Sequence, residues 1–276
     1  MHARDGSFDS WRRWNVPAIS PDGGRLAYTD GRKLLIRDLA SLESVEIAVQ
    51  DLPLMAVWAP DSSFVVFATE RAEASALWRV AAAGGAPSKI CDLPTWMFSG
   101  LAMQGDHTVV VNLSNGSFRG RLLRVDARGG GPQPMTGRTE DESSTAIVNL
   151  GGLPDGALTY QQLRGGAPEM VVEGPGKARA TLGLPPHWRL SYAPSGHLLY
   201  DRRPGGIWAV PFDLATHTVT GEPFRITADG TAPTISSDGT LAYGRDVAGL
   251  RQLTWVGRDG TTQGTIGPPQ EFISGL

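Results

Sequence analysis

A four-residue turn recurs along the chain and constrains the fold more than any other feature of the sequence. Its second residue is at position 21, 60, 104, 154, 194 and 237, so successive copies are 39 to 50 residues apart. The third copy, Met103–Asp106, lacks the proline. The other copies carry Pro-Asp-Gly or a close variant: Ser20–Gly23, Ala59–Ser62, Leu153–Gly156, Ala193–Gly196 and Ser236–Gly239. Strand-rich repeats of roughly 40–50 residues are typical of β-propeller blades.

Each turn lies between two short apolar segments. In the first unit Val16–Ile19 precedes the turn and Arg25–Tyr28 follows it. Proline fixes φ and Asp-Gly tolerates a positive φ, so the pattern predicts a tight hairpin. A third segment such as Lys33–Arg37 and a fourth such as Ser44–Ala48 follow in each unit. The predicted fold is all-β: a six-bladed β-propeller of four-stranded antiparallel blades.

The chain is long enough for one such propeller. It has 276 residues with 35 glycines and 20 prolines, a turn content that suits about two dozen short strands. We expect a single domain over residues 1–276, with units that start near residues 16, 55, 98, 146, 188 and 232. The tail 270–276 either helps to close the ring or starts a further blade. The lone cysteine, Cys91, excludes an internal disulfide and is expected to be buried and inert.

The charge of the chain argues against a polyanionic partner. The net charge is −3 and the 25 Lys and Arg residues are scattered, whereas nucleic-acid binders usually carry a basic stripe. No run of 18 apolar residues is present, which predicts no membrane span in this chain. Met1–Gly6 lacks the apolar core of a signal peptide. We therefore expect no nucleic acid partner and, by default, a cytoplasmic location.

Further motifs accompany the turns in a fixed order. An Ala-Gly-Gly-x-Pro turn is present at Ala83–Pro87, a Tyr-Ala-Pro-x-Gly-His-Leu-Leu-Tyr block at Tyr192–Tyr200, and a Thr-Gly-Glu-Pro turn at Thr220–Pro223. The stretch Ser236–Tyr243 then leads into Gln252–Val256. With these motifs the repeat resembles the TolB-type (PD40 or WD40-like) propeller repeat over nearly the whole chain. It resembles most the propeller regions attached to bacterial serine/threonine protein kinases.

This resemblance implies a binding role. Propellers of that group are regarded as sensor, scaffold or protein-interaction modules beside a catalytic domain, and TolB itself binds partner proteins. The chain has no Gly-rich loop with a following strand lysine, no His-Arg-Asp and no Asp-Phe-Gly, so kinase activity does not carry over. The resemblance also implies that the chain is part of a larger kinase-linked or receptor protein, which would make it extracytoplasmic if it is excised from a kinase receptor.

Binding residues are expected in the links between units. In a propeller the link from the last strand of one unit to the first strand of the next lies at one mouth of the central channel, and loops on a rigid scaffold carry function. Aromatic, Arg and Met residues are enriched at binding surfaces. An alternative is that these aromatic side chains only fill gaps between blades. The candidate set from the links is Trp96, Met97, Asp141, Glu142, His187, Trp188 and Arg189.

No metal site or cofactor is predicted. Of the five histidines only His187 belongs to the candidate set. His107 and His197 follow hairpin turns, and His217 is in a loop at the outer rim of the ring, so a site with several histidine ligands is not expected. The acidic run Glu140–Glu142 could supply oxygen ligands to calcium or magnesium, but a solvated acidic loop is the simpler interpretation. The turn aspartates are better explained by local hydrogen bonds than by catalysis.

Two functions remain open from the sequence. The first is a non-catalytic sensor or scaffold that binds a protein or peptide at the channel mouth. The second is an enzyme, a lyase, cyclase or hydrolase, with a site in the central channel around His187 and Arg189. A Ser-His-Asp triad on this side would have to use Ser99 or Ser191 with His187 and Asp141. The resemblance favours binding, and the sequence identifies neither the ligand nor the oligomeric state.

Overall fold

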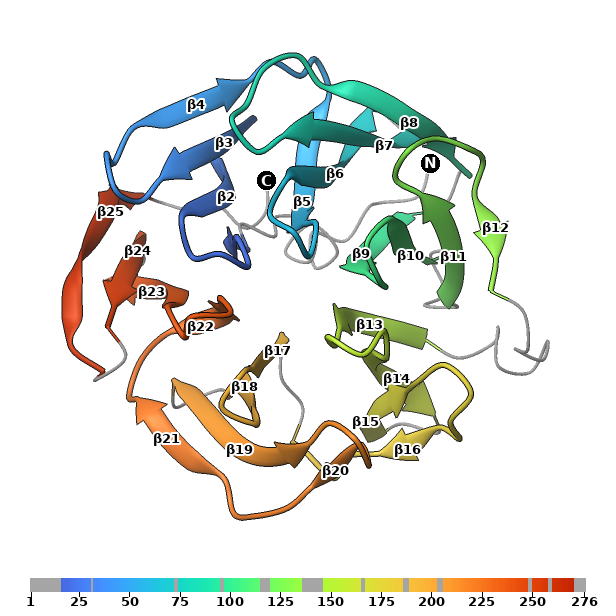
Figure 1. Ribbon diagram of the computed structural model, residues 1–276, viewed down its shortest axis with the longest axis vertical. Helices are drawn as coiled ribbons and strands as arrows, with labels where there is room; N and C mark the ends of the chain where they lie inside the picture. Colours follow the sequence, from blue (N-terminus) through green and yellow to red (C-terminus); the bar gives the residue numbers. More distant parts are fainter. Residues whose placement is uncertain are drawn as a thin grey trace, which may run out of the picture.

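Six antiparallel sheets are arranged in a ring about a common axis (Figure 1). The computed structural model describes residues 16–30, 32–71, 74–94, 97–114, 120–135, 146–164, 167–185, 189–202, 206–247, 250–257 and 260–270. Each sheet is one blade built from consecutive strands, and its first strand is nearest the axis. The predicted six-bladed propeller is therefore confirmed. These residues contain no helix, and so none of them forms a helix that could cross a membrane.

The first three blades have four strands each. Blade 1 consists of β1 (Ala18–Ile19), β2 (Arg25–Asp30), β3 (Lys33–Asp38) and β4 (Ser44–Ile47). Blade 2 consists of β5 (Leu52–Trp58), β6 (Phe64–Arg71), β7 (Ala74–Ala81) and β8 (Ser88–Leu93). Blade 3 consists of β9 (Met97–Met103), β10 (Thr108–Ser114), β11 (Gly120–Asp126) and β12 (Gln133–Pro134).

The other three blades follow the same order, with one addition. Blade 4 consists of β13 (Ala146–Gly152), β14 (Leu158–Arg164), β15 (Ala167–Glu173) and β16 (Ala180–Thr181). Blade 5 consists of β17 (Leu190–Ala193), β18 (His197–Asp201), β19 (Ile207–Asp213), β20 (Thr218–Val219) and β21 (Phe224–Thr227). Blade 6 consists of β22 (Thr231–Ile235), β23 (Leu241–Val247), β24 (Leu250–Val256) and β25 (Thr262–Gln270). The sequence did not predict β20, which pairs with the end of β19 while β21 pairs with its start.

The hydrophobic core lies between the blades. Side chains of one strand point alternately to the two neighbouring blades. In β2, Leu26 belongs to a cluster with Ala242 of blade 6, whereas the next residue, Ala27, belongs to a cluster with Phe67 of blade 2. All of Phe64–Ala68 in β6 is buried for the same reason. The central strands are therefore apolar on both faces, which explains their apolar runs in the sequence.

The ring closes where blade 6 meets blade 1. Among the described residues no strand is exchanged between these two blades. The Ser237 N–H donates to the Pro21 carbonyl (2.7 Å), and the Ile19 N–H donates to Thr234 Oγ1 (3.3 Å). Closure thus depends on packing and on a few hydrogen bonds. The strand β25 ends at residue 270, and residues 271–276 lie outside the described part of the chain, so both alternatives for the tail stay open.

The substitution Gly23→Ala is expected to weaken this seam. Gly23 has φ +75°, and an added Cβ would lie 2.9 Å from Oδ1 of Asp238. Gly196 occupies the same turn position in blade 5 with φ +76°, but there the nearest atom would be 3.7 Å away. Both alanines incur the left-handed penalty of about 1 kcal/mol. Urea unfolding should therefore show a loss roughly 1 kcal/mol larger for Gly23→Ala than for Gly196→Ala. Equal losses would contradict a close contact at the seam.

Candidate functional site

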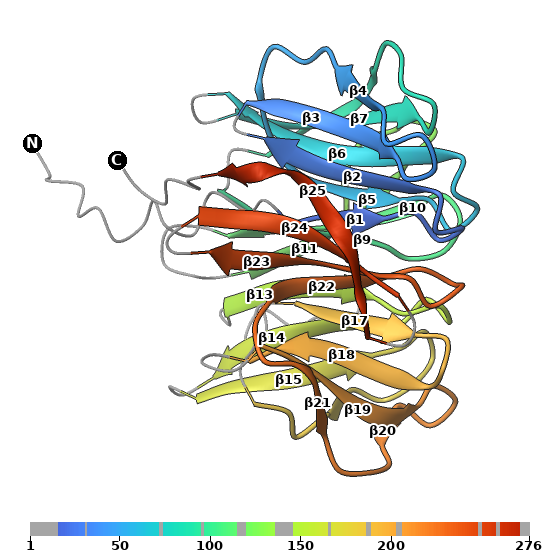
Figure 2. The ribbon, with the colours of Figure 1, turned by 90° about the vertical axis from the view of Figure 1, so that its left-hand side faces the viewer.

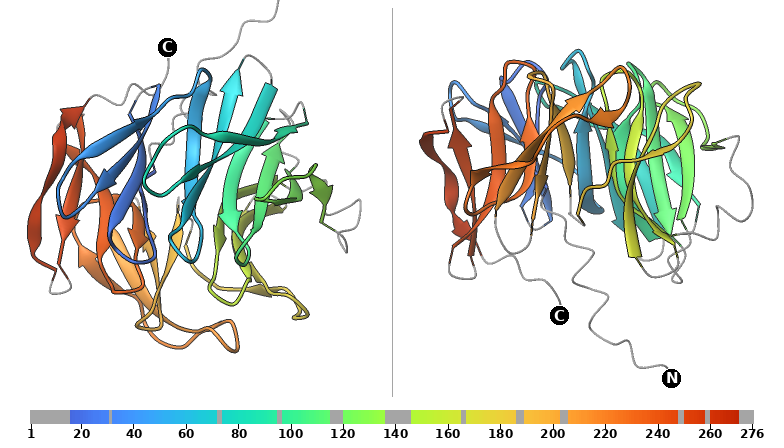
Figure 3. Two further views of the ribbon diagram at one scale, coloured as in Figure 1. Left: turned by 45° about the horizontal axis from the view of Figure 1, so that its top comes forward. Right: turned by 90° about the horizontal axis from the view of Figure 1, so that it is seen from below.

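The ring has two faces with different loops. The links between blades and the turns between the second and third strands lie on one face, here called the link face. The Pro-Asp-Gly turns and the turns between the third and fourth strands lie on the other, the turn face. Figures 2 and 3 show the strands running between these two faces. Of the residues chosen from the sequence, Met97 and Arg189 are described, and both belong to the link face.

The structure tests few of those residues. Met97 is the first residue of β9, and Arg189 directly precedes β17. Of the serines considered for a triad, Ser99 is in β9 and Ser191 is in β17. The remaining candidates lie outside the described residues: Trp96, Asp141, Glu142, His187 and Trp188. The predicted set therefore stays a prediction.

Arg189 is held beside a buried carboxylate that the sequence analysis missed. The Arg189 N–H donates to Oδ1 of Asp201 (3.2 Å), and the Ala232 N–H donates to Oδ2 (3.4 Å). Asp201 ends β18 and is only 1% exposed. Burial lowers the pKa of Arg189 to about 10, and the negative charge of Asp201 opposes this shift. Asp201 thus ties the link before blade 5 to the first strand of blade 6.

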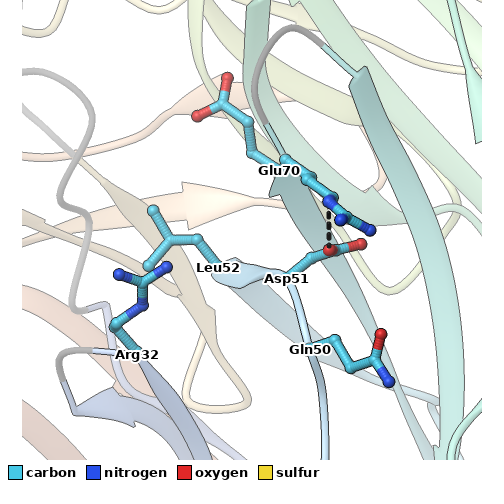
Figure 4. Close-up of a pocket in the computed structure, with 6 residues that line it drawn as sticks. Arg32, Gln50, Asp51, Leu52 and Glu70 are labelled. Carbon is cyan, nitrogen blue, oxygen red and sulfur yellow. Dashed lines mark ion pairs between the residues drawn. The ribbon is translucent and has the colours of Figure 1, made fainter.

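A pocket of about 350 Å³ opens on the link face between blades 1 and 2 (Figure 4). Arg32 comes from the turn between β2 and β3, and Asp51 and Leu52 come from the link into β5. Glu70 and Arg71 end β6, and Gln50 completes the lining. Three separate segments therefore bring charged side chains to one concave surface.

The charges in this pocket are incompletely paired. Arg71 Nε is 3.9 Å from Asp51 Oδ1, and the Arg71 side chain is 77% exposed. An exposed pair at this distance contributes little to stability. Arg32 forms no ion pair with another described residue, and Figure 4 shows its guanidinium pointing toward Leu52. The pocket thus offers the cation of Arg32, the weakly paired carboxylate of Asp51 and the apolar side chain of Leu52 to a ligand.

The sequence analysis found only part of this pocket. It did not select the link at Asp51 and Leu52, because that link has no aromatic, Arg or Met residue. It missed Arg32 and Arg71 because they lie in or next to the turns between the second and third strands. The second strand of every blade returns to the link face, so these turns lie beside the links. Charged residues at the turn between the second and third strands are the signal that would have identified them.

No metal centre is built from the residues that the structure describes. Among them no three His, Cys, Asp or Glu side chains are grouped so that they could hold an ion. The acidic run that includes Asp141 and Glu142 lies outside these residues. The calcium or magnesium alternative therefore stays untested.

On the turn face, the repeated aspartates stabilise the turns. Each Oδ1 accepts a hydrogen bond from the N–H two residues later, at 3.0 to 3.1 Å. These residues are Asp22, Asp61, Asp155 and Asp238. This is the local geometry that Asp favours in turns. The repeated carboxylate is therefore a structural feature of each hairpin.

Asp155 also binds the neighbouring blade. His217, from the loop before β20, is 3% exposed, and its Nε2 is 2.6 Å from Asp155 Oδ2. Lys177 Nζ is 3.8 Å from the same oxygen and donates to the Ala215 carbonyl at 2.7 Å. Burial would raise the pKa of the Asp155 carboxyl, but the hydrogen bonds from His217 and the Ala157 N–H lower it below its ordinary value. A charged contact therefore joins blades 4 and 5.

The fold resembles solved propellers of diverse kinds. TolB from Acinetobacter baumannii matches with a TM-score of 0.69 and 17% identity, over 95% of this chain and 66% of that chain. An oligogalacturonate lyase in complex with manganese matches with a TM-score of 0.60 and 18% identity, over 86% and 75% of the two chains. A chain of the nidogen/laminin complex matches with a TM-score of 0.63 and 15% identity, over 88% and 93%. No protein-family model and no curated protein matches the chain.

These similarities establish the fold alone. The chain has a TolB-like six-bladed propeller fold, and it spans 66% of the TolB chain. Its structural neighbours include enzymes and proteins of binding complexes. The link to kinase-attached propellers, which the sequence motifs suggested, has no support among them.

The substitution Asp155→Asn should destabilise the propeller in a pH-dependent way. The variant loses the charge-assisted hydrogen bond between Asp155 and His217. This loss should lower the free energy of unfolding by about 1–2 kcal/mol at pH 7. The folded-state pKa of Asp155 is depressed. Its stabilisation is therefore present above the unfolded pKa of about 3.9 and is lost as the pH falls through the lower folded value.

The matched control for this measurement is Asp61→Asn. Among the described residues Asp61 makes the same turn hydrogen bond but no hydrogen bond or ion pair to another blade. The charge of His107 in blade 3 is the last and smallest of the effects that lower the pKa of Asp61. Urea unfolding at pH 7 and at pH 3 should show that the difference in free energy of unfolding between Asp155→Asn and the wild type is smaller at pH 3. At pH 7 the difference between Asp61→Asn and the wild type should be smaller than that for Asp155→Asn. A difference in free energy of unfolding between Asp155→Asn and the wild type that does not change with pH would refute the charged contact.

Cys91 is less buried than the sequence suggested, and its predicted inertness stays a prediction. It is half-buried in β8 and packs against the core between blades 2 and 3. Burial raises the pKa of the thiol to about 11, Asp92 raises it further and Lys89 opposes the shift. Alkylation by iodoacetamide at pH 8 should therefore be about 100-fold slower than for free cysteine. The rate should rise to that of free cysteine in 6 M guanidinium, and a native rate within about tenfold of the unfolded one would contradict the shift.

Proposed function

We propose that this propeller is a non-catalytic module that binds a peptide segment of a partner protein on its link face. The observation that carries the proposal is the pocket between blades 1 and 2, where Arg32 has no ion pair with another described residue. Loops on a rigid propeller scaffold hold such a pocket in one shape. The candidate link residues Trp96, Met97 and Trp188 would extend the contact along the same face.

The chemistry of the pocket favours a peptide with an acidic residue next to an apolar one. A carboxylate of the ligand would pair with Arg32, and its neighbouring side chain would contact Leu52. Asp51 on the other side of the pocket would bind a cationic group of the same peptide. The long Arg71–Asp51 pair stabilises the free protein little, so exchanging it for contacts with a ligand costs little.

The wider role proposed is that of a sensor or scaffold within a larger bacterial protein. The sequence motifs that resemble kinase-attached propellers support this role, and so does the similarity to TolB in fold. The nidogen/laminin complex shows that a propeller of similar fold occurs in a complex between proteins. Gene context with a kinase domain or a receptor domain beside this chain would support the proposal further.

The enzyme alternative gains no specific observation. It depended on His187 and Arg189, and only Arg189 is described. The carboxylate beside Arg189 is that of Asp201, which accepts backbone N–H groups on both oxygens. Such a carboxylate has a structural role in holding the links. We therefore derive no reaction for this face.

Charge reversal at Arg32 should abolish peptide binding. A random twelve-residue peptide library displayed on phage would be selected on the purified protein, and the dissociation constants of selected peptides measured by fluorescence anisotropy. We expect Arg32→Glu to weaken binding at least tenfold, about 1.4 kcal/mol. The reason is that the ion pair between Arg32 and the acidic residue of the peptide is replaced by repulsion between two carboxylates. A peptide with Lys in place of its acidic residue should recover binding to Arg32→Glu.

The matched control is Arg128→Glu, the same charge change on the turn face. Arg128 pairs with Asp126 and lies far from the link face in the strand order. Its variant should bind the selected peptides as the wild type does. If Arg32→Glu and Arg128→Glu lose affinity equally, or if neither loses any, the link-face pocket is not the binding site.

A further inference from the structure

A second concave surface lies on the other side of the molecule, between blades 5 and 6. It encloses about 560 Å³ and opens toward the turn face. Its floor is part of the core between these blades, with Leu199 and Ala209 from blade 5 and Leu241 from blade 6. Its edge carries Phe224 and Ile226 of β21, which are 49% and 37% exposed. Here this surface is called the 5/6 groove.

The equivalent space between blades 1 and 2 is partly occupied by Val45, which itself stays 44% exposed. There Gly84, in the turn after β7, lies so close to Val45 that an added Cβ would be 2.7 Å from Val45 Cγ1. Ile47 completes that contact and is 1% exposed. In blade 6 the equivalent turn glycine is Gly260, which makes the same turn hydrogen bond, yet an added Cβ there would meet nothing within 4 Å.

The 5/6 groove is therefore an apolar space that its own blades leave open. Burying the exposed faces of two large side chains would stabilise the protein by about 25 cal/mol for each Å² removed from water. Exposed apolar surface that is concave and continuous with a core marks a binding site rather than ordinary surface. A ligand that fills the groove would take the place that Val45 fills between blades 1 and 2.

One end of the groove is polar, and Asp238 is the only Asp, Glu, Lys or Arg among the described residues that line it. Ser195 Oγ is 3.1 Å from Nδ1 of His197, and the His197 ring meets the Phe224 ring edge-on at 5.6 Å. Asp238 also lines the groove, but its carboxylate is bound by Ser236 and Thr240 and lies against the Gly23 backbone of blade 1. The described side-chain polar groups that remain for a ligand are the hydroxyls of Ser195 and Ser237 and the imidazole of His197.

We propose that the 5/6 groove binds a small, uncharged organic molecule with an apolar body and one hydrogen-bonding group. Its volume is within the range of small-molecule sites, which are mostly apolar with a few placed polar groups. The hairpin turns of both blades stand at its inner end, which suits a compact ligand better than an extended chain. The apolar body would lie between Phe224 and Leu241, and the polar group would bond to the Ser195–His197 pair.

The test uses Nile red, an uncharged aromatic dye whose fluorescence rises in apolar sites. Titration into the full chain should give saturable binding of one dye per chain. The double variant Phe224→Ser with Ile226→Ser should weaken binding at least tenfold, since each lost apolar contact contributes about 1 kcal/mol. Both side chains are exposed, so the variant should fold. In an NMR titration, the dye should shift the imidazole signals of His197 and leave those of His217 unchanged.

The matched control is Leu42→Ser, which removes another exposed apolar side chain, 57% exposed, from blade 1. It should leave dye affinity unchanged. Equal affinity in the double variant and the wild type would overturn the proposal, and so would an equal loss in Leu42→Ser. A dimer in sedimentation velocity that Phe224→Ser with Ile226→Ser abolishes, and that excludes the dye, would instead assign the groove to a second copy of this chain. The variant Arg32→Glu should bind the dye normally, so this test is independent of the peptide site.

Discussion

Each blade of this propeller must pack against a neighbour on both of its faces, and the rest of the structure depends on that constraint. It places Leu26 in one inter-blade core and Ala27 in the next, although the two residues are adjacent in sequence. It also means that the blades are joined without shared strands, so side chains must set their spacing. Polar contacts between turns contribute to this. The Asp22 N–H donates to Ser62 Oγ, and the pair of His217 with Asp155 joins blades 5 and 4.

These contacts make the two faces of the ring unequal. On the turn face, polar atoms are used between neighbouring hairpins, as where the Gln104 side chain donates to the Gly156 carbonyl. That glutamine stands where most copies of the turn have proline, so the third hairpin keeps its place by a side-chain hydrogen bond to blade 4. On the link face, the pocket beside Arg32 retains a cation that no described residue pairs. Polar groups that are not needed to hold the scaffold are those available to a ligand.

The sequence predicted the fold because its signal is local. A Pro-Asp-Gly turn specifies a hairpin within four residues, and six hairpins at a regular period specify a propeller. The contacts that build sites are not local. His217 is 62 residues from Asp155, and nothing in its own loop predicts that it is buried. Arg32 belongs to blade 1 and Arg71 to blade 2. They come close only because the second strand of each blade returns to the link face. Most of the predicted candidate set lies outside the described residues, so its value stays open.

The two proposed surfaces depend on different physics, and this limits how they can act together. The pocket at Arg32 relies on exposed charges, whose attraction is screened over about 8 Å at physiological ionic strength. The 5/6 groove relies on apolar burial, which salt does not screen. They lie on opposite faces of the ring, and no described residue lines both of them. Coupling would have to pass through the blade-to-blade contacts of the ring. The seam between blades 6 and 1 lies on the shorter path between the two surfaces, and there the Asp238 carboxylate that lines the groove also rests on Gly23. A ligand that moved the hairpin of blade 6 would therefore act on blade 1 through this contact, since a close-packed contact transmits displacement.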